Sequence, residues 1–147
     1  LLHYPESSTG AYMTTDYIAI PQGITLDQAF EKVRSLENLP DFLLYFYVLE
    51  NEFSNKLTGV VSIYELFSKD LRTRVETAMI DSVIFAYPND HIKDTLKKLY
   101  RYNISAIPVV TRSEKKLLGI VTFRDAVTAY LPKRWKIRVR RVFNGSS

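Results

Sequence analysis

The stretch "GIVTFRD" occupies residues 119–125, and "GVVSIYE" occupies residues 59–65. Each reads glycine, two aliphatic residues, a hydroxyl residue, two unrelated residues and a carboxylate. The similarity extends to "KLTGVVSIYELF" against "KLLGIVTFRDAV", and back along the chain to Met13 against Met79. A pattern that returns in the same order indicates an internal repeat. The sequence therefore predicts two copies of one unit, residues 13–70 and 79–131.

The first copy predicts the order strand, helix, strand, strand, helix. After a first strand that includes Ile18 and Ala19, apolar residues recur at helical spacing at Leu26, Ala29, Phe30, Val33 and Leu36. Thr25 and Gln28 have the spacing of a capping box that begins this helix. The short apolar run at 43–49 predicts a buried strand, "ENEFSNK" predicts a turn, and 57–62 predicts the returning strand. A short helix is expected from Ile63.

The second copy repeats this plan. Its helix is marked by Ile92, Leu96, Leu99 and Tyr100, with His91 as a solvated residue at the helix start. Asn103 stands where a left-handed residue is expected to end that helix. The short apolar runs at 107–110 and 117–122 predict two strands. Pro108 does not exclude the first of them, because a proline is tolerated at the start of a strand. The helix "FRDAVTAYL" follows and ends before Pro132.

Neither copy is large enough to bury both faces of its sheet, since about 50 residues give a marginal core. Two copies packed sheet to sheet share one core and are related by a pseudo-twofold axis. The predicted fold class is therefore α/β (α+β), with a β-α-β-β-α unit in each copy. Residues 1–12 are expected to lead in from a lost N-terminal domain, 71–78 to link the copies, and 132–147 to form a basic tail.

Composition excludes several classes of protein. The 147 residues contain no cysteine, which excludes disulfides, thiolate metal sites and a cysteine nucleophile. The longest apolar run, "FLLYFYVL", has eight residues, far fewer than the roughly 18 of a membrane helix. The two histidines, His3 and His91, are far apart, and no catalytic triad or glycine-rich phosphate loop is recognisable. We expect a protein that is not an enzyme.

The net charge of +4 comes from the C-terminal tail. Residues 133–141, "KRWKIRVRR", carry six basic residues, and the rest of the chain carries 14 basic against 16 acidic residues. Trp135, Ile137 and Val139 alternate with cations. Three interpretations stay open: an added extended segment that packs on another domain, a basic stretch beside a membrane, or phosphate contacts with nucleic acid. No nucleic-acid motif supports the third, and no nucleic-acid partner is expected.

These motifs resemble a tandem pair of CBS domains, often called a Bateman module. The residues that carry the resemblance are Gly59–Ser62 with Glu65, Gly119–Thr122 with Asp125, and "ISAIPVV" at 104–110. The segments "YPESSTGAYMTTDYIAI" at 4–20 and "DLRTRVETAM" at 70–79 also resemble the corresponding segments of MgtE-type magnesium transporters. The resemblance implies a cytoplasmic regulatory module on a divalent-cation transporter, with a homodimer and an attached membrane transport domain as partners.

The repeated hydroxyl and carboxylate predict a ligand site. Thr122 ends a strand, and Asp125 lies one helical turn further on the same face. Such a pair can accept hydrogen bonds from the two hydroxyls of a ribose, and the helix N-terminus favours a phosphate nearby. In CBS pairs this position resembles the ribose contact of adenine nucleotides, so ATP, ADP and AMP are the expected ligands. Ser62 and Glu65 form the equivalent pair in the first copy. The alternative is that Thr122 and Asp125 only cap a helix.

The remaining pocket walls are expected to be apolar. They are taken from the first strands and from the segment "SAIP", at Ile18, Ala19, Ile80, Val83, Ala106, Ile107 and Pro108. The competing interpretation is that these residues form the core. Tyr47 or Tyr64 is a candidate to stack on a base, and Arg72 and Arg74 are candidates to contact phosphates. Ordinary packing and solvation are the respective alternatives.

A role in sensing Mg²⁺ requires clustered carboxylates, because this ion binds oxygen ligands. The resemblance implies such a cluster, but the chain is basic after "TAYLP", where MgtE-type proteins tend to be acidic. The available acids are Asp16, Asp81, Asp90 and Asp125, and no two have the spacing of a site. The metal ligands are therefore not assigned. Two other functions stay open: a ligand-free dimerisation scaffold, or the nucleotide-sensing module of another transporter or enzyme.

Overall fold

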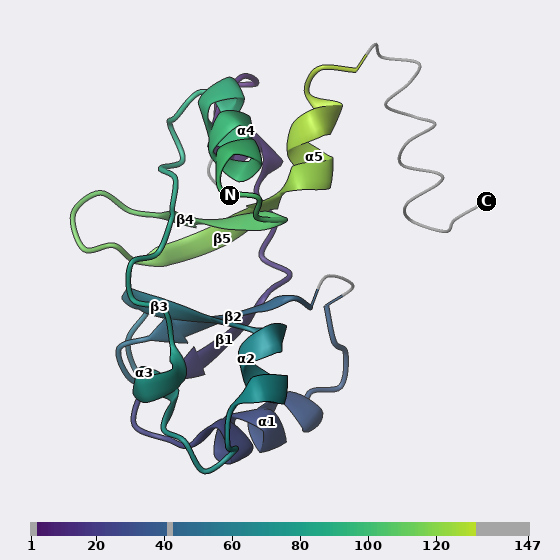
Figure 1. The fold of residues 1–147 in the computed structure, drawn as a ribbon. Helices are drawn as coiled ribbons and strands as arrows, with labels where there is room; N and C mark the ends of the chain where they lie inside the picture. The colour runs from purple at the N-terminus through teal and green to yellow at the C-terminus, as the bar shows by residue number, and fades with distance from the viewer. Residues whose placement is uncertain (1–2, 41–42, 132–147) are drawn as a thin grey trace.

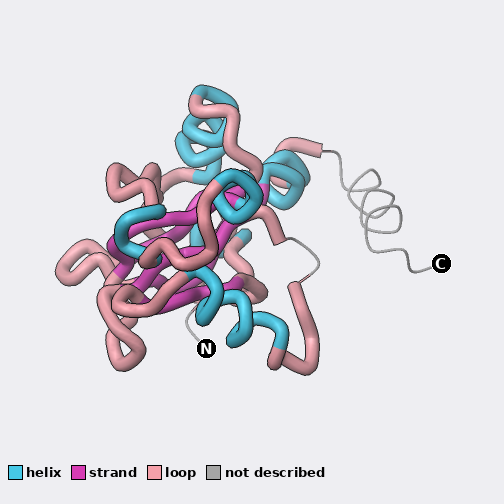
Figure 2. The backbone as a smooth tube through the Cα atoms, turned by 60° about the horizontal axis from the view of Figure 1, so that its bottom comes forward, coloured by secondary structure: helices cyan, strands magenta, loops and turns pink. Residues whose placement is uncertain are grey.

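A computed structural model describes residues 3–40 and 43–131. Two β-sheets face each other and helices cover their outer faces, so that the layers run helix, sheet, sheet, helix (Figure 1). Figure 2 shows the strands gathered in the middle with the helices around them. The elements, in chain order, are the 3-10 helix η1 (Thr9–Tyr12), β1 (Ile18–Pro21), α1 (Leu26–Arg34), β2 (Tyr45–Leu49), β3 (Leu57–Ser62), α2 (Ile63–Ser68), α3 (Val75–Ala78), α4 (Ile92–Arg101), β4 (Ala106–Val110), β5 (Leu117–Thr122) and α5 (Phe123–Thr128). The predicted fold class is confirmed.

The first repeat forms a three-stranded sheet in the order β1-β2-β3. β1 pairs parallel to β2, with Ile18 opposite Phe46. β2 pairs antiparallel to β3, with Tyr45 opposite Ser62. Helix α1 provides the crossover that a parallel pair requires.

The second repeat differs from the prediction in its first strand. β4 and β5 form a two-stranded antiparallel sheet, and the expected first strand is reduced to a single parallel bridge between Ala86 and Val109. The backbone N–H of Tyr87, one residue on, donates to the carboxylate of Asp90 at 2.9 Å. Hydrogen bonds to one neighbour in a parallel pair come from alternate residues, so the next donor toward β4 after Ala86 would be residue 88, and Pro88 has no N–H.

Three apolar clusters hold the layers together. The middle cluster lies between the sheets and contains Tyr47, Leu57, Ala106, Val110, Leu117 and Ile120, all of them buried. Two outer clusters lie between each sheet and its own helices. The middle cluster takes residues from both repeats, so each sheet covers the inner face of the other, as the doubled sequence predicts.

The helix ends follow the local sequence signals. The Thr25 hydroxyl accepts from the Gln28 N–H, and the Gln28 side chain accepts from the Thr25 N–H, which confirms the capping box. His91 is exposed, and its Nδ1 accepts from the Lys93 N–H at the start of α4. Asn103 has φ of 52°, the left-handed conformation predicted for it.

Each of the two segments that lead into the repeats packs on the other repeat, rather than on the repeat that follows it. We call residues 8–14 and 74–80 the leading segments. The first packs on the second repeat: Ser8 bridges His91, and Thr14 bridges Ile120. The second packs on the first repeat, where Arg74 bridges Thr25 and Ile80 bridges Val60. Each repeat is therefore completed by the segment that leads into the other.

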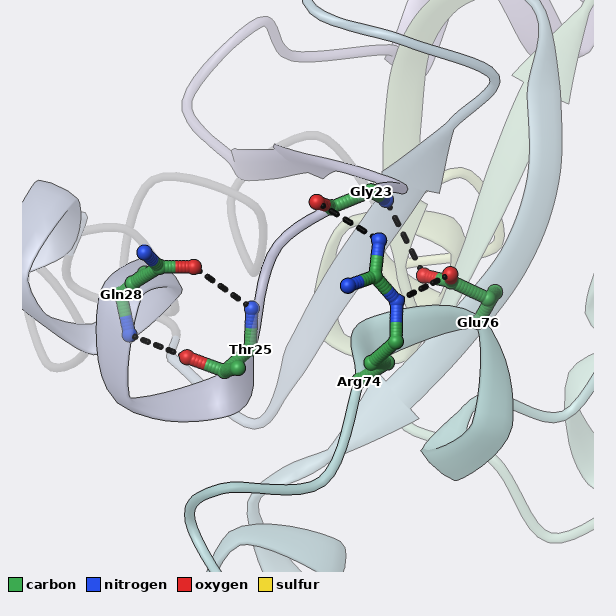
Figure 3. A network of polar contacts seen from close by, with 5 residues as sticks. All are labelled: Gly23, Thr25, Gln28, Arg74 and Glu76. Atoms are coloured by element: carbon green, nitrogen blue, oxygen red, sulfur yellow. Dashed lines mark hydrogen bonds and ion pairs between the residues drawn. The ribbon is translucent and has the colours of Figure 1, made fainter.

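Hydrogen bonds anchor both leading segments. The Thr9 N–H donates to the Asp90 carbonyl at 2.7 Å, and its hydroxyl lies 2.6 Å from that of Thr95, buried under α4. In the other segment, Glu76 accepts from the Gly23 N–H at 3.0 Å and from Arg74 Nε at 2.9 Å (Figure 3). Arg74 also donates to the Gly23 carbonyl. These bonds lie on the loops that start α4 and α1, respectively.

The hairpins meet at the pseudo-twofold axis. Lys56 and Lys116 occupy equivalent positions in the two repeats and bridge each other. The Leu57 N–H donates to the Lys115 carbonyl, and the Leu117 N–H donates to the Asn55 carbonyl. The basic tail predicted at 132–147 lies outside the described residues.

Candidate functional site

The strand-to-helix junction of the second repeat holds the Thr122–Asp125 pair. Thr122 is the last residue of β5 and the N-cap of α5, and its side chain is buried. Its hydroxyl accepts a hydrogen bond from the Asp125 N–H at 3.1 Å. Thr122 therefore has the capping role that competed with its ligand role, and it caps the backbone N–H of Asp125 rather than pairing with the Asp125 carboxylate. A hydroxyl that accepts one bond can still donate its proton.

The first repeat places Ser62 and Glu65 in the same way, with a different set of contacts. Ser62 is the N-cap of α2, but its side chain makes no cap hydrogen bond. Glu65 lies 3.9 Å from the ammonium group of Lys69. Both residues are half-buried. The two junctions are equivalent in the fold and unequal in chemistry.

A crevice of about 710 Å³ opens beside Thr122, where α4 ends, β4 begins and α5 starts. Apolar side chains, hydroxyls and cations share its wall: Leu99, Tyr100, Arg101, Asn103, Ile104, Ser105, Thr122, Phe123 and Arg124. A neighbouring apolar groove of about 510 Å³ shares Tyr100, Arg101 and Phe123 with it. Of the residues predicted from the sequence, only Thr122 lines the larger crevice.

The first repeat reaches this crevice through Tyr45. The Ser105 N–H donates to the Tyr45 hydroxyl at 3.3 Å. The first leading segment arrives from the same repeat, because Thr14 exchanges two backbone hydrogen bonds with Ile120, two residues before Thr122. Residues of both repeats therefore meet at this junction.

The predicted apolar walls divide between the seam and the outer cores. Ala106 pairs with Thr122, and Pro108 pairs with Ile120, so both lie on the strand beside the junction. Ile18 and Ile107 are buried in the clusters between sheet and helices. Side chains alternate between the two faces of a strand, so Ile18 and Ile107 face away from the seam.

Of the other predicted wall residues, Ile80 lies near the Ser62 junction. Ile80 bridges Val60, two residues before Ser62, and remains 47% exposed. Val83 packs against the middle cluster, while Ala19 is exposed in β1. The structure therefore places the candidate wall residues near two different junctions.

The aromatic and basic candidates have separate surroundings. Tyr47 is buried between the sheets, burial raises its pKa above the ordinary value, and its hydroxyl has no hydrogen-bond partner in the described part of the chain. Tyr64 is 80% exposed. Arg72 is paired with Asp70, and Arg74 is held by Glu76 and Gly23. Both arginines lie in the link between the repeats.

The acidic candidates do not come together. Asp90 accepts from the Tyr87 N–H and lies 3.9 Å from Arg112, while Asp16 and Asp81 are exposed. Within residues 3–40 and 43–131, no three acidic or histidine side chains are grouped as a metal site would require.

Sequence reasoning assigned none of the other eight lining residues to the site, among them Arg101, Ile104, Ser105, Phe123 and Arg124. A signal for two of them was available. Antiparallel pairing of the two predicted strands sets Ala106 opposite Thr122, which brings Ile104 and Ser105 to the same sheet edge. The contribution of Arg101 depends on the angle at which α4 packs, which no local pattern fixes.

Comparisons with known proteins agree with this architecture. A family model for the CBS domain matches residues 10–72 and again 75–132. The chain is 35% identical over 127 residues to the magnesium transporter MgtE of Bacillus subtilis, covering 86% of this chain and 28% of the relative. It is 32% identical over 127 residues to the magnesium transporter MgtE of Enterococcus faecalis, covering 86% of this chain and 27% of that protein.

Among solved structures, a similar one is the cytosolic domain of the Mg²⁺ channel MgtE, crystallised in complex with ATP. It superposes with a TM-score of 0.77 at 30% sequence identity, covering 84% of this chain and 49% of that chain. The present chain thus spans little more than a quarter of the curated transporters that it matches. None of the helices in residues 3–40 and 43–131 has the length and apolar character that crossing a membrane requires.

Proposed function

This chain belongs to the CBS-domain family, with two copies of the domain, and from that premise we propose that it is the cytosolic regulatory module of a magnesium-type transporter. It binds an adenine nucleotide in the crevice beside Thr122 and passes a conformational change to the attached transport domain. It has no catalytic step and acts as a homodimer. Its similarity to MgtE proteins and to a cytosolic domain crystallised with ATP supports the proposal.

The mixed lining of the crevice is the observation that carries this proposal. Ile104 and Phe123 offer apolar surface to a base, and the Thr122 and Ser105 hydroxyls can bond a ribose. Arg101 and Arg124 bring positive charge for phosphates. Pockets for such ligands combine apolar walls with a few placed polar groups. Mg²⁺ enters the proposal as the ion that accompanies the phosphates of ATP.

The exchanged leading segments provide the coupling. A ligand held by Thr122 fixes the end of β5, and the same strand holds Thr14 through two backbone hydrogen bonds. The first leading segment then transmits the position of β5 toward any domain that precedes it. A ligand shifts such an equilibrium only as far as it prefers one arrangement over the other.

Calorimetric titration of the chain with ATP, ADP, AMP and MgCl₂ tests the proposal. We expect heat with at least one nucleotide, together with a higher melting temperature, because a ligand that binds only the folded state stabilises it by about 2.7 kcal/mol at 100 times Kd. Heat with MgCl₂ alone identifies direct sensing of the ion. No heat and no thermal shift with any of them overturns the proposal and favours the ligand-free dimerisation scaffold.

Variants locate the site. Thr122→Val and Ser105→Ala are expected to weaken nucleotide binding at least tenfold, because both hydroxyls line the crevice. Ser62→Ala is the matched control, since Ser62 ends β3 as Thr122 ends β5. Loss of binding in Ser62→Ala with unchanged affinity in Thr122→Val assigns the nucleotide to the first repeat instead. Light scattering tests the homodimer, which has twice the 17.0 kDa of one chain.

A further inference from the structure

The turns of the two hairpins, β2–β3 and β4–β5, form a second crevice, of about 470 Å³, which we call the hairpin crevice. Every residue that lines it is polar or charged: Glu50, Ser54, Lys56, Arg112, Ser113, Glu114, Lys115 and Lys116. A backbone bridge between Lys56 and Lys116, which both line the crevice, joins the two hairpins. Both repeats therefore contribute to one concave surface on the pseudo-twofold axis.

The hairpin crevice has an excess of positive charge. Four cations against two carboxylates leave a formal charge of +2 on its lining. The carboxylates neutralise the two bridged lysines, since Glu50 lies 3.9 Å from Lys56 and Glu114 lies 3.0 Å from Lys116. The excess therefore falls on Arg112 and Lys115. Asp90 lies 3.9 Å from Arg112, outside the lining, and offsets part of the charge.

Aromatic rings of the middle cluster hold these two cations in place. The Arg112 guanidinium lies over the Tyr87 ring, 4.1 Å from its centroid, and the Lys115 ammonium lies 4.9 Å from the centroid of Phe85. Tyr87 and Phe85 both pack against the buried residues between the sheets. A cation placed over an aromatic face is attracted by the ring. The two charges are thus attached to the core, and less side-chain freedom is lost when they bind an anion.

Strand β5 separates this crevice from the nucleotide site. Lys116 precedes the first residue of β5, and Thr122 is the last. A strand rises about 3.3 Å per residue, so the two sites are roughly 20 Å apart along the strand. One nucleotide cannot occupy both.

We propose that the hairpin crevice binds a soluble oligophosphate anion. The guanidinium of Arg112 is a planar donor that matches phosphate oxygens, and Lys115 adds a point charge. Ser54 accepts from the Lys56 N–H at 3.0 Å and keeps its own proton to donate. The anion binds against the second hairpin, which carries both cations, and the Ser54 hydroxyl adds a donor from the first hairpin. This site is additional to the nucleotide site and does not depend on it.

Titration with sodium tripolyphosphate in 150 mM salt tests the assignment, with the double variant Arg112→Gln/Lys115→Gln. We expect the affinity to fall at least tenfold. The matched control is Lys32→Gln/Lys93→Gln, which removes the same charge from two exposed helical lysines. Its affinity is expected to stay within twofold. An equal loss in both double variants means unspecific attraction to positive charge and overturns the site, as does the absence of heat with the unaltered chain.

Titration with AMP separates this proposal from the nucleotide site. Thr122→Val is expected to lower the affinity for AMP and to leave the affinity for tripolyphosphate unchanged. Arg112→Gln/Lys115→Gln is expected to lower the affinity for tripolyphosphate and to leave the affinity for AMP unchanged. If AMP fails to bind while tripolyphosphate binds in the hairpin crevice, only the nucleotide proposal falls. If the Arg112/Lys115 variant weakens both ligands equally, the two sites are not separate and the present inference falls.

Discussion

Met13 occupies the space in which a side chain on Gly119 would lie. A β-carbon built on Gly119 would also stand 2.7 Å from the carbonyl oxygen of Thr14, closer than real β-carbons approach backbone atoms. Gly59 stands in the same relation to Met79, with the Ile80 carbonyl at 3.0 Å. The repeated glycine therefore exists because each leading segment crosses the last strand of the other repeat at this point.

Gly119→Ala is expected to destabilise the fold by about 1–3 kcal/mol, because overpacking displaces backbone and side chains. Gly59→Ala is expected to cost less, since the Ile80 carbonyl lies farther away. Chemical denaturation measures both values. Equal stability of Gly119→Ala and the unaltered chain would show that the first leading segment does not press on β5.

Thr122→Ala is expected to lower the free energy of unfolding by about 1 kcal/mol, because it removes the N-cap of α5. Ser62→Ala is the matched substitution in the other repeat, and its cost is expected to be smaller, because the Ser62 side chain makes no cap hydrogen bond. Urea denaturation of the two variants provides the comparison. A larger loss in Ser62→Ala contradicts the observed difference between the junctions.

Glu76 makes the free energy of unfolding depend on pH in the acidic range. Hydrogen bonds from the Gly23 N–H and then from Arg74 lower the pKa of Glu76 from 4.5 to about 2. The folded state holds this carboxyl as its anion more strongly than the unfolded state does, so its contribution is complete above pH 4.5 and is lost as the pH falls toward 2. We expect Glu76→Gln to melt below the unaltered chain at pH 7.

The difference in melting temperature between Glu76→Gln and the unaltered chain should shrink as the pH falls from 4.5 to 2. Glu52→Gln, at an exposed acid outside this network, controls for the loss of one negative charge. A difference in melting temperature that is the same at pH 7 and pH 2.5 would contradict the assigned role of Glu76.

Tyr47→Phe is expected to raise the melting temperature. The Tyr47 hydroxyl is buried without a hydrogen-bond partner among residues 3–40 and 43–131, and an unsatisfied buried polar group costs about 1–3 kcal/mol. Tyr45→Phe is the control, because it removes the acceptor of the Ser105 N–H and is expected to lower stability by about 1 kcal/mol. A lower melting temperature in Tyr47→Phe would mean that its hydroxyl is satisfied in solution.

Sequence patterns predicted the features that are stabilised by residues close to them in the sequence. The capping box at Thr25 and the left-handed Asn103 depend on a few neighbouring residues, and both are observed. Helices η1 and α3 were not predicted, because distant partners stabilise them. The Thr9 N–H donates to the Asp90 carbonyl, and the Val75 N–H donates to that of Ile24.

The candidate site was harder to predict than the fold, because every residue of β4 is buried. A strand covered on both faces shows no alternation of polar and apolar residues. The sequence therefore did not reveal that Ala106 faces the seam and Ile107 the helices. The hydroxyl and carboxylate of Thr122 and Asp125 were recognisable by their repetition, whereas Arg124 stands at a position of that pattern where the first copy has Tyr64 and therefore gave no repeated signal.

The exchange of the leading segments also constrains the order of events during synthesis. Residues 8–14 leave the ribosome about a hundred residues before the strand that receives Thr14, a delay of roughly 5–20 s at ordinary translation rates. Until β5 has emerged, the first leading segment has no strand to pair with. Folding of the nascent pair of repeats is thus expected to be completed only after β5 has emerged, rather than one repeat at a time.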